Sequence, residues 1–388
     1  MGIKNLHSFL RSKCPEIYKT VHLSEFSYRK IAIDISLYMF KYKTIFGDKW
    51  LDAFIKLIAC LRKNEIHCVF IYDNGAPPEK MSEREERANK KQKLIDKIKN
   101  ISDNIESFFQ TGEPTELLME IYSKNQPTKL TRLLTPARNE KIFDISIAEQ
   151  YLEKVKKQVV NIDYSDFPLT RKLFDIIGVP YFDAVLEAET TCSHLCLSGV
   201  VDGVLSEDTD VLAYGTPLFL TKINTSTETC VIVEIKDILE SLDLTYFQFR
   251  DLCIMSGCDY NKNIPRVGSQ TAYKLLTEHG SIDDLPEKFD ISILNHNRGR
   301  ELFTLDDQLK WEIPFCREPD WSELKLFLFK NNSRINMDYL ERCFRSKEIV
   351  FEESEEEFIK ELFSGEDSSD ENSDENSNQN SDEEKIEL

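Results

Sequence analysis

Two short segments near the start of the chain combine β-branched residues with an aspartate near their end. Residues 29–36 read Arg-Lys-Ile-Ala-Ile-Asp-Ile-Ser, and residues 67–73 read His-Cys-Val-Phe-Ile-Tyr-Asp. Apolar runs of this length are typical of strands buried on both faces. Between them, residues 50–62 carry apolar side chains at 50, 51, 54, 55, 58 and 61, the spacing of one helix face. Strand, helix and strand in this order predict a parallel βαβ unit.

Two later segments, residues 200–206 and 218–223, have the same apolar character and predict further strands. The sequence therefore predicts an α/β fold with a mainly parallel central sheet flanked by helices. Such a sheet gathers its chemistry at the carboxyl ends of its strands. Four aspartates fall at or just beyond predicted strand ends: Asp34, Asp73, Asp208 and Asp210.

The segments between these strands differ in character. Residues 79–100 form a charged, helix-permissive run that, taken alone, is interpreted as a solvated helix face. Residues 101–160 have irregular periodicity and three prolines, which indicates a partly helical spacer. We expect an N-terminal region at 1–100, a spacer insertion at 101–164, an internal region at 165–290, a C-terminal helical region packing on the core at 291–351 and a disordered acidic tail at 352–388.

Charge and composition refine this picture. The formal net charge of the 388 residues is −20, but residues 352–388 hold 16 acidic and 2 basic side chains, which leaves only −6 for the body. A near-neutral body can present a basic face to nucleic acid. No stretch approaches the roughly 20 apolar residues of a membrane span, and the start lacks a signal-peptide core. We therefore expect an intracellular, soluble protein, with its ten cysteines reduced.

Acidic residues are unusually frequent in otherwise apolar surroundings. Buried carboxylates are costly unless they are paired or bind cations, and one of them could serve as a cap or turn, whereas seven could not. Carboxylates without histidine or cysteine suit Mg²⁺, with Mn²⁺ as the alternative, and two such ions could drive phosphodiester hydrolysis. No nucleophile elbow and no Walker loop is visible. The seven acids are Asp34, Asp73, Glu187, Glu189, Asp208, Asp210 and Asp259.

Several ordered motifs resemble the flap endonuclease (Rad2/XPG) family of structure-specific 5′ nucleases. Residues 1–6, 31–36 and 70–80 are similar to the family's N-terminal region, and residues 178–189, 206–217 and 257–260 to its internal region. The resemblance implies a PIN-like 5′ nuclease fold with a helical arch and a helix–two-turn–helix element. It also implies that the seven acids hold two Mg²⁺ ions. The stretch 210–217 is most similar to the flap endonuclease branch.

The resemblance assigns further residues. Lys80 and Arg87, seven and fourteen residues after Asp73, match the lysine and arginine of the family's arch that reach the scissile phosphate; Arg84 is a competitor if the helix register differs. Gly2 resembles the N-terminal glycine near the family's active site. Phe40 lies where relatives keep an aromatic near the displaced nucleotide, with Tyr38 as the alternative and a core position as the ordinary reading of either.

Residues 264–268, Ile-Pro-Arg-Val-Gly, followed by an amphipathic stretch, resemble the helix–two-turn–helix element. A tight glycine turn before a helix exposes N–H groups to a phosphate, so Arg266 and Gly268 would hold duplex DNA by its backbone. In the family this element also holds a potassium ion. An ordinary helix hairpin is the alternative.

The sequence also departs from the family. The interval from Asp73 to Glu187 is longer than in typical flap endonucleases, which leaves open whether a 5′ end threads the arch. Asn74 stands where the family usually has glycine. Residues 356–363 have the apolar spacing of a sliding-clamp motif without its leading glutamine and one aromatic, so clamp binding competes with an amphipathic remnant.

Together these features predict a monomeric Mg²⁺-dependent endonuclease that cuts branched DNA at single-strand/double-strand junctions, in the nucleus or another site of DNA replication or repair. A 5′-to-3′ exonuclease or a bubble or junction cutter on the same scaffold is the first alternative. A catalytically silent DNA-binding scaffold is the second, and the complete acidic set argues against it.

Overall fold

In the computed structural model, which describes residues 2–125, 143–159, 162–304 and 311–345, seven strands form one sheet. Their order is β1-β7-β6-β5-β2-β3-β4; the strands from β6 to β4 are parallel, whereas β7 and β1 are antiparallel to their neighbours. The predicted α/β class with a mainly parallel sheet is confirmed. The strands are β1 Lys19–His22, β2 Lys30–Asp34, β3 His67–Tyr72, β4 Tyr181–Asp183, β5 Gly203–Leu205, β6 Leu218–Asn224 and β7 Thr229–Glu234.

The two apolar segments with terminal aspartates form the central pair, β2 and β3, and the helix predicted between them is α3, Trp50–Lys63. The strand predicted over 200–206 is shorter in the structure, because its first residues still hydrogen-bond to the end of the preceding helix. The N–H groups of Val200 and Val201 both donate to the carbonyl of Leu195, at 2.9 and 3.1 Å. Pairing of β5 therefore begins only at Gly203.

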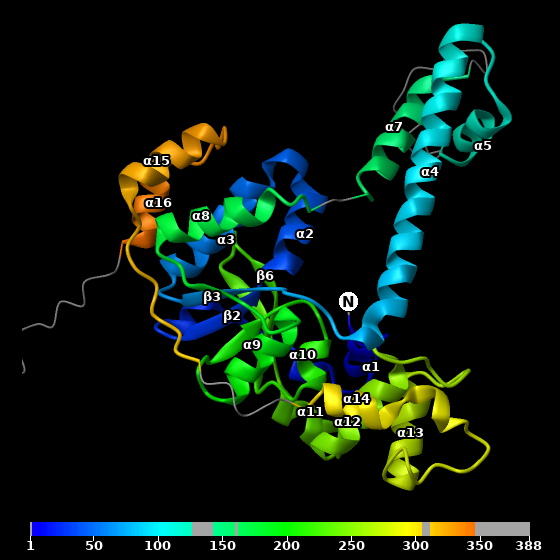
Figure 1. Ribbon diagram of the computed structural model, residues 1–388, viewed down its shortest axis with the longest axis vertical. Helices are drawn as coiled ribbons and strands as arrows, with labels where there is room; N and C mark the ends of the chain where they lie inside the picture. The colour runs from blue at the N-terminus through cyan, green and yellow to red at the C-terminus, as the bar shows by residue number, and fades with distance from the viewer. Residues whose placement is uncertain (1, 126–142, 160–161, 305–310, 346–388) are drawn as a thin grey trace, which may run out of the picture. The chain divides into compact units, whose positions relative to one another are not determined.

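Helices lie on both faces of the sheet (Figure 1), and alternating side chains of β2 and β3 face two separate apolar layers. Ala32 and Val69 point to one layer, and Ile31 and Phe70 to the other. The first layer is covered by α1 Leu6–Lys13, α9 Ala188–Leu197, α10 Asp210–Ala213, α11 Ile235–Leu242, α12 Tyr246–Ser256, α13 Ser269–His279 and α14 His296–Leu302. The second is covered by α2 Ile35–Phe46, α3, α8 Asp166–Ile177, α15 Trp321–Lys330 and α16 Met337–Phe344.

In the described part of the charged run and the predicted spacer, three helices share a small core of their own. A short 3-10 turn, Pro78–Lys80, leads into α4, Met81–Thr111, which continues without a break past residue 100. Helices α5, Glu116–Lys124, and α7, Ile145–Lys156, pack on its distal half. Their shared cluster is Ile101, Ile105, Leu118, Ile121, Ala148 and Leu152.

The last helices return to the body of the protein. Helix α15 packs against α8, and α16 against α3. The N–H of Arg317 donates to the carbonyl of Gly178 at 2.8 Å, which attaches the segment before α15 to the end of α8. The acidic tail, with the clamp-like stretch at 356–363, lies outside the described residues. None of the helices in the described part of the chain has the length and apolar character that crossing a bilayer requires.

Candidate active site

The carboxyl ends of the two central strands carry the first two acids. Asp34 is the last residue of β2 and caps α2, because its Oδ1 accepts the N–H of Ser36 at 2.8 Å. Asp73 follows β3, and its Oδ1 accepts the N–H of Ala188 at 2.8 Å. The second aspartate therefore joins the end of β3 to the start of α9.

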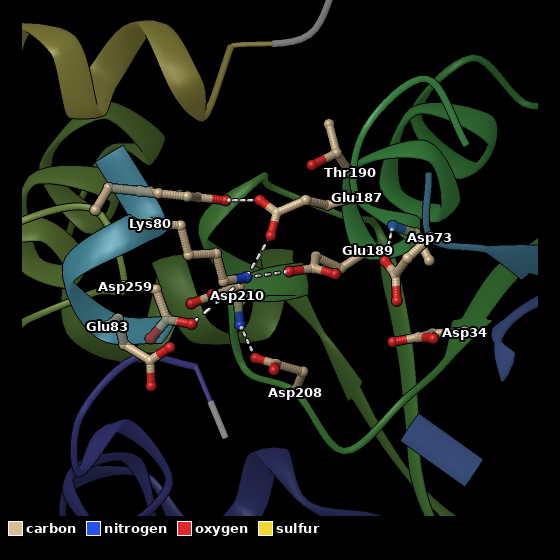
Figure 2. Close-up of polar contacts among 12 residues, drawn as sticks. Asp34, Asp73, Lys80, Glu83, Glu187, Glu189, Thr190, Asp208, Asp210 and Asp259 are labelled. Atoms are coloured by element: carbon tan, nitrogen blue, oxygen red, sulfur yellow. Dashed lines mark hydrogen bonds and ion pairs between the residues drawn. The ribbon is translucent and has the colours of Figure 1, made fainter. Parts of the chain in front are cut away.

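The other acids arrive at the same edge from helix ends. Glu187 and Glu189 stand at the start of α9, Asp208 and Asp210 at the start of α10, and Asp259 just beyond α12. The Oδ1 of Asp208 accepts the N–H of Asp210 at 3.0 Å. Figure 2 shows that the structure brings all seven acids named from the sequence into one cluster.

Lys80 is the cation at the centre of this cluster. It ends the 3-10 turn before α4 and is buried, with 8% of its surface exposed. Its Nζ lies 2.5 Å from Glu187 Oε1, 3.0 Å from Glu189 Oε1 and 3.5 Å from Asp259 Oδ2 (Figure 2). Burial opposes its charge, but the carboxylates of Glu189 and Glu187 raise the pKa of Lys80 above its ordinary value. Lys80 is therefore held as an ammonium ion among acids.

Arg87 reaches the cluster from the second turn of α4. Its guanidinium lies 3.0 Å from Asp259 Oδ2 and also pairs with Glu83, one turn earlier on the same helix. Arg84, the competing position, is exposed like Arg87, but among the described residues only Arg87 of the two contacts an acid of the cluster. The register of α4 thus turns Arg87 towards the acids. Glu83, which orients the guanidinium, is not singled out by the sequence, although its i,i+4 spacing from Arg87 is a visible signal.

Asp210 differs from the other acids because both of its carboxylate oxygens are buried and, in the described part of the chain, have no hydrogen-bond partner. A buried acceptor without a partner is costly, so the site requires a cation or a proton there. Among the residues that the structure describes, no three acidic, histidine or cysteine side chains are already arranged to hold a metal ion. Lys80 instead partly neutralises the acids. The all-oxygen donor set still fits a hard divalent cation.

Burial and mutual repulsion raise the pKa values of several of these acids. Burial and then the neighbouring carboxylate of Asp73 raise the pKa of Asp34 well above its usual range, and burial followed by the carboxylate of Asp208 does the same for Asp210. Burial raises the pKa of Glu189 to about 7, although Lys80 lowers it. Seven carboxylates face only two cationic side chains, so the cluster has a deficit of positive charge.

Gly2 lies against the acids, as the resemblance implies. A Cβ atom on Gly2 would lie 2.0 Å from Asp208 Oδ1 and 2.7 Å from the backbone nitrogen of Asp210, and its φ of +79° disfavours any side chain. The next residues connect this end of the chain to the helix–two-turn–helix region. The N–H of Lys4 donates to the Gly257 carbonyl at 2.9 Å, and Ser269 Oγ donates to the Lys4 carbonyl at 3.1 Å.

The two aromatic candidates on α2 are separated by burial. Tyr38 has no exposed surface and packs in the core, whereas Phe40 is 44% exposed. Tyr38 is therefore unavailable for stacking on a nucleotide, and the alternative that assigned it this role is wrong. Phe40 is accessible.

The helix–two-turn–helix region consists of α12, α13 and the loop between them. The tight turn expected at Gly268 is made instead by Arg266, which has a left-handed φ of +65°, while Gly268 is extended with φ −120°. Gly268 caps α13, and nothing lies within 4 Å of the position of a Cβ atom there. The N-terminus of α13 is thus open to a phosphate, but the reason is the missing side chain rather than a glycine turn.

Residues 1–94 match the family model of the XPG N-terminal domain, and residues 178–259 match that of the XPG I-region. A probable RAD2-like endonuclease of Invertebrate iridescent virus 3 is 33% identical over 83% of this chain and 89% of its own length. A flap endonuclease 1-A of Oryza sativa is 30% identical over 86% of this chain and 83% of its own. The catalytic core of Rad2, solved with a DNA substrate, superposes over 88% of this chain with a TM-score of 0.56 at 16% identity. The matched regions contain all seven acids together with Lys80 and Arg87.

Proposed function

The chain belongs to the Rad2/XPG family of flap endonucleases, and on this premise we propose that it hydrolyses phosphodiester bonds at single-strand/double-strand junctions of branched DNA, with 5′ flaps as the preferred substrate. The observation that carries the proposal is the cluster of seven acids, which Lys80 contacts from the 3-10 turn and Arg87 contacts from α4. A cluster of carboxylates with two cationic side chains beside it matches the demands of phosphoryl transfer, in which positioning and electrostatics dominate.

The acids would hold two Mg²⁺ ions, or Mn²⁺ in their place. Asp210 is the central ligand, because its buried oxygens have no partner among the described residues. Glu189, Asp208 and Asp259 lie around it, and Asp34 and Asp73 lie together beyond Glu189 (Figure 2). Bound ions of this class activate water and stabilise charge on the attacking and leaving oxygens. A potassium ion at the helix–two-turn–helix loop is a further part of this proposal.

The protein's own cations would act on the scissile phosphate. Lys80 and Arg87 are held by carboxylates, so both are oriented before DNA arrives. When a phosphate enters, it competes with Glu189 and Asp259 for their N–H groups. Such contacts stabilise the transition state more than the ground state where charge develops during reaction. The open N-terminus of α13 would hold the duplex by its backbone.

Metal binding should be visible in thermal stability, with a defined pH dependence. Because the folded-state pKa values of Asp34, Asp210 and Glu189 lie above the unfolded ones, the stability that these acids contribute to the metal-free protein is full at low pH and is lost as pH rises through the folded pKa, about 7 for Glu189. We therefore expect the melting temperature without metal to fall between pH 5.5 and pH 8. Added Mg²⁺ should raise it more at pH 8 than at pH 5.5, as measured by scanning fluorimetry. An equal rise at both pH values would contradict a carboxylate site.

Arg84 and Arg87 provide a matched pair on one helix. Arg87→Ala should lower the single-turnover rate by roughly 10²-fold, on the scale of a lost transition-state contact, with little change in the dissociation constant measured in Ca²⁺. Arg84→Ala should leave the single-turnover rate nearly unchanged, because the helix register turns Arg87 rather than Arg84 to the acids. Similar losses of rate in both variants would show that α4 acts through general charge.

A panel of end-labelled 5′-flap, nicked, bubble and four-way substrates with Mg²⁺ tests the proposed function. We expect cutting at the flap junction to be fastest. The fastest cutting on bubbles or four-way junctions, or stepwise removal of nucleotides from duplex ends, would favour the alternative activities. No cutting of any substrate would favour a DNA-binding scaffold.

The same panel tests threading when the flap carries a bulky adduct at its 5′ end. If α4, α5 and α7 form an arch over the acids, a strand that cannot pass cannot place its junction phosphate on the site. A blocked flap should therefore be cut much more slowly than an open one. Equal rates on the two flaps would mean that these helices are a side insertion.

The remaining expectations about partners and location belong to this proposal as well. We propose that the protein acts as a monomer at a site of DNA replication or repair, in the nucleus or elsewhere. A sliding clamp is a candidate partner through residues 356–363.

A further inference from the structure

Three hydroxyl side chains lie directly behind the acids. Thr190 comes immediately after the Glu-Ala-Glu motif, Tyr260 immediately after the Gly-Cys-Asp motif, and Tyr214 one helical turn after the Asp-Thr-Asp motif. The sequence gives no reason to connect them, because they lie far apart along the chain. In the structure they are neighbours.

The three hydroxyls form a continuous hydrogen-bonded chain that ends on an acid. Thr190 Oγ1 lies 2.7 Å from the Tyr214 hydroxyl, which lies 3.1 Å from the Tyr260 hydroxyl. The Tyr260 hydroxyl lies 2.8 Å from Glu187 Oε2. All three distances are in the range of direct hydrogen bonds.

The direction of the chain follows from its end. An ionised carboxylate can only accept, so the Tyr260 hydroxyl donates to Glu187. Its oxygen then accepts from Tyr214, whose oxygen accepts from Thr190. Every proton in the chain thus points towards the carboxylate, an arrangement in which each bond strengthens the next.

The surroundings hold the chain in one geometry. Tyr214 and Tyr260 are 2% and 6% exposed. The ring of Phe303 lies edge-on to both, with centroids 5.1 and 5.4 Å away. The other oxygen of Glu187 binds the Nζ of Lys80, which also lies 5.9 Å from the centre of the Tyr260 ring. Both carboxylate oxygens of Glu187 are therefore engaged, in contrast to the unpartnered oxygens of Asp210.

We propose that Thr190, Tyr214 and Tyr260 are positioning residues that fix Glu187 in one orientation and, through Glu187, place the Lys80 ammonium for the phosphate. This inference rests on the proposed nuclease function and specifies how the Lys80 ammonium is oriented towards the phosphate. It also separates the acids by task. Glu187 holds the lysine, while Asp210 leaves its oxygens open to a metal ion.

Hydroxyl deletions test the chain. Tyr260→Phe should lower the single-turnover rate about tenfold, the effect of one lost hydrogen bond to a charged group. Tyr214→Phe should lower it about threefold, since it acts one bond further away between neutral groups. The dissociation constant for flap DNA in Ca²⁺ should stay unchanged in both variants. A loss confined to DNA affinity would overturn the proposal.

The double variant gives the sharper result. If Tyr214 acts only through Tyr260, the variant lacking both hydroxyls should be as slow as Tyr260→Phe alone. Tyr246→Phe is the control, because it also removes a hydrogen-bonded tyrosine hydroxyl, one that is half-buried and donates to the Ala213 carbonyl at 3.1 Å. Its rate should equal that of the wild type. If the rate reductions of Tyr214→Phe and Tyr260→Phe multiply in the double variant, the proposed hydrogen-bonded chain is refuted. Thr190→Val serves in place of Tyr214→Phe if the latter does not fold.

A second readout needs no cleavage and separates this inference from the proposed function. Acetylation of Lys80 by N-hydroxysuccinimide acetate, followed by peptide mass spectrometry, reports how firmly Glu187 holds the amine. The acetylated fraction of Lys80 should increase in Tyr260→Phe and should not increase in Tyr246→Phe. If the wild type cuts no branched substrate, the proposed function fails while this labelling still tests the chain. Equal labelling in the wild type and Tyr260→Phe would overturn it.

Discussion

Asp210→Ala is expected to abolish cleavage while leaving DNA binding largely intact. The side chain is fully buried, and its two oxygens have no partner among the described residues, so it is the acid most exclusively available to a metal ion. Removing a residue that binds the ion directly should lower the cleavage rate by more than the ~10- to 100-fold that follows the removal of a residue that only hydrogen-bonds to a metal ligand. Single-turnover cleavage of a 5′ flap in Mg²⁺, alongside binding of the same flap in Ca²⁺, measures both effects.

The same position should show an opposite effect on stability. Burial and the carboxylate of Asp208 raise the pKa of Asp210, which means that the folded state disfavours its charge. Asp210→Asn removes that charge at constant shape, so the metal-free variant should melt at a higher temperature than the wild type at pH 8. Asp175→Asn is the control. Asp175 lies away from the seven acids and accepts a hydrogen bond from the Tyr181 hydroxyl. Near-normal cutting by Asp210→Asn would refute the assignment of the metal site.

Lys80→Ala is expected to reduce the single-turnover rate by about 10²-fold or more, the scale of a lost electrostatic contact in a transition state. The ammonium touches three acids in a buried site and has no comparable substitute, because Arg87 contacts only the outermost of them, Asp259. Binding of flap DNA in Ca²⁺ should change little. A loss of affinity with an unchanged rate would return Lys80 to the role of a general basic residue.

In Lys80→Ala, the single-turnover rate and the melting temperature of the metal-free protein should both decrease. Without Lys80, Glu187 and Glu189 remain buried and lose their cation, so the melting temperature of the metal-free protein should decrease. Mg²⁺ should recover part of that decrease. Lys63→Ala is the control, because Lys63 pairs with Glu228 at a half-exposed surface position, and such pairs contribute little. The opposite stability effects at Asp210 and Lys80 distinguish a charge imbalance from general damage to the fold.

The central sheet could be predicted because burial on both faces leaves a uniform local signal. The central residues of the two predicted segments, 31–33 and 68–72, are apolar without interruption, and they lie in β2 and β3. The edge strand β1 has no such signal, since its residues are mostly exposed and its pairing partner β7 lies about 200 positions later in the chain. The three-residue strand β4 is too short to produce any periodicity.

The acids could be predicted for the same local reason, since each adjoins a strand or helix end. Their partners could not. Lys80 and Glu187 are 107 positions apart, and only tertiary packing brings them to 2.5 Å. The choice between Tyr38 and Phe40 depends on which face of α2 meets the core, and the left-handed residue before α13 is Arg266 rather than the neighbouring glycine. The sequence thus predicts which residue types form the site, but the direction in which each side chain points depends on tertiary packing.

The unbroken length of α4 has a mechanical consequence. At 1.5 Å per residue, its 31 residues extend for roughly 46 Å, and Arg87 lies only about 10 Å from its start. The start is anchored by Lys80 and by the Arg298–Glu79 ion pair at 2.7 Å. A tilt of about 10° around that anchor moves the far end of a rigid helix by roughly 8 Å but Arg87 by less than about 2 Å. If a strand passes these helices, the displacement that it imposes on α5 and α7 would be reduced several-fold at Lys80 and Arg87, and the geometry of the acids would depend little on the size of the strand.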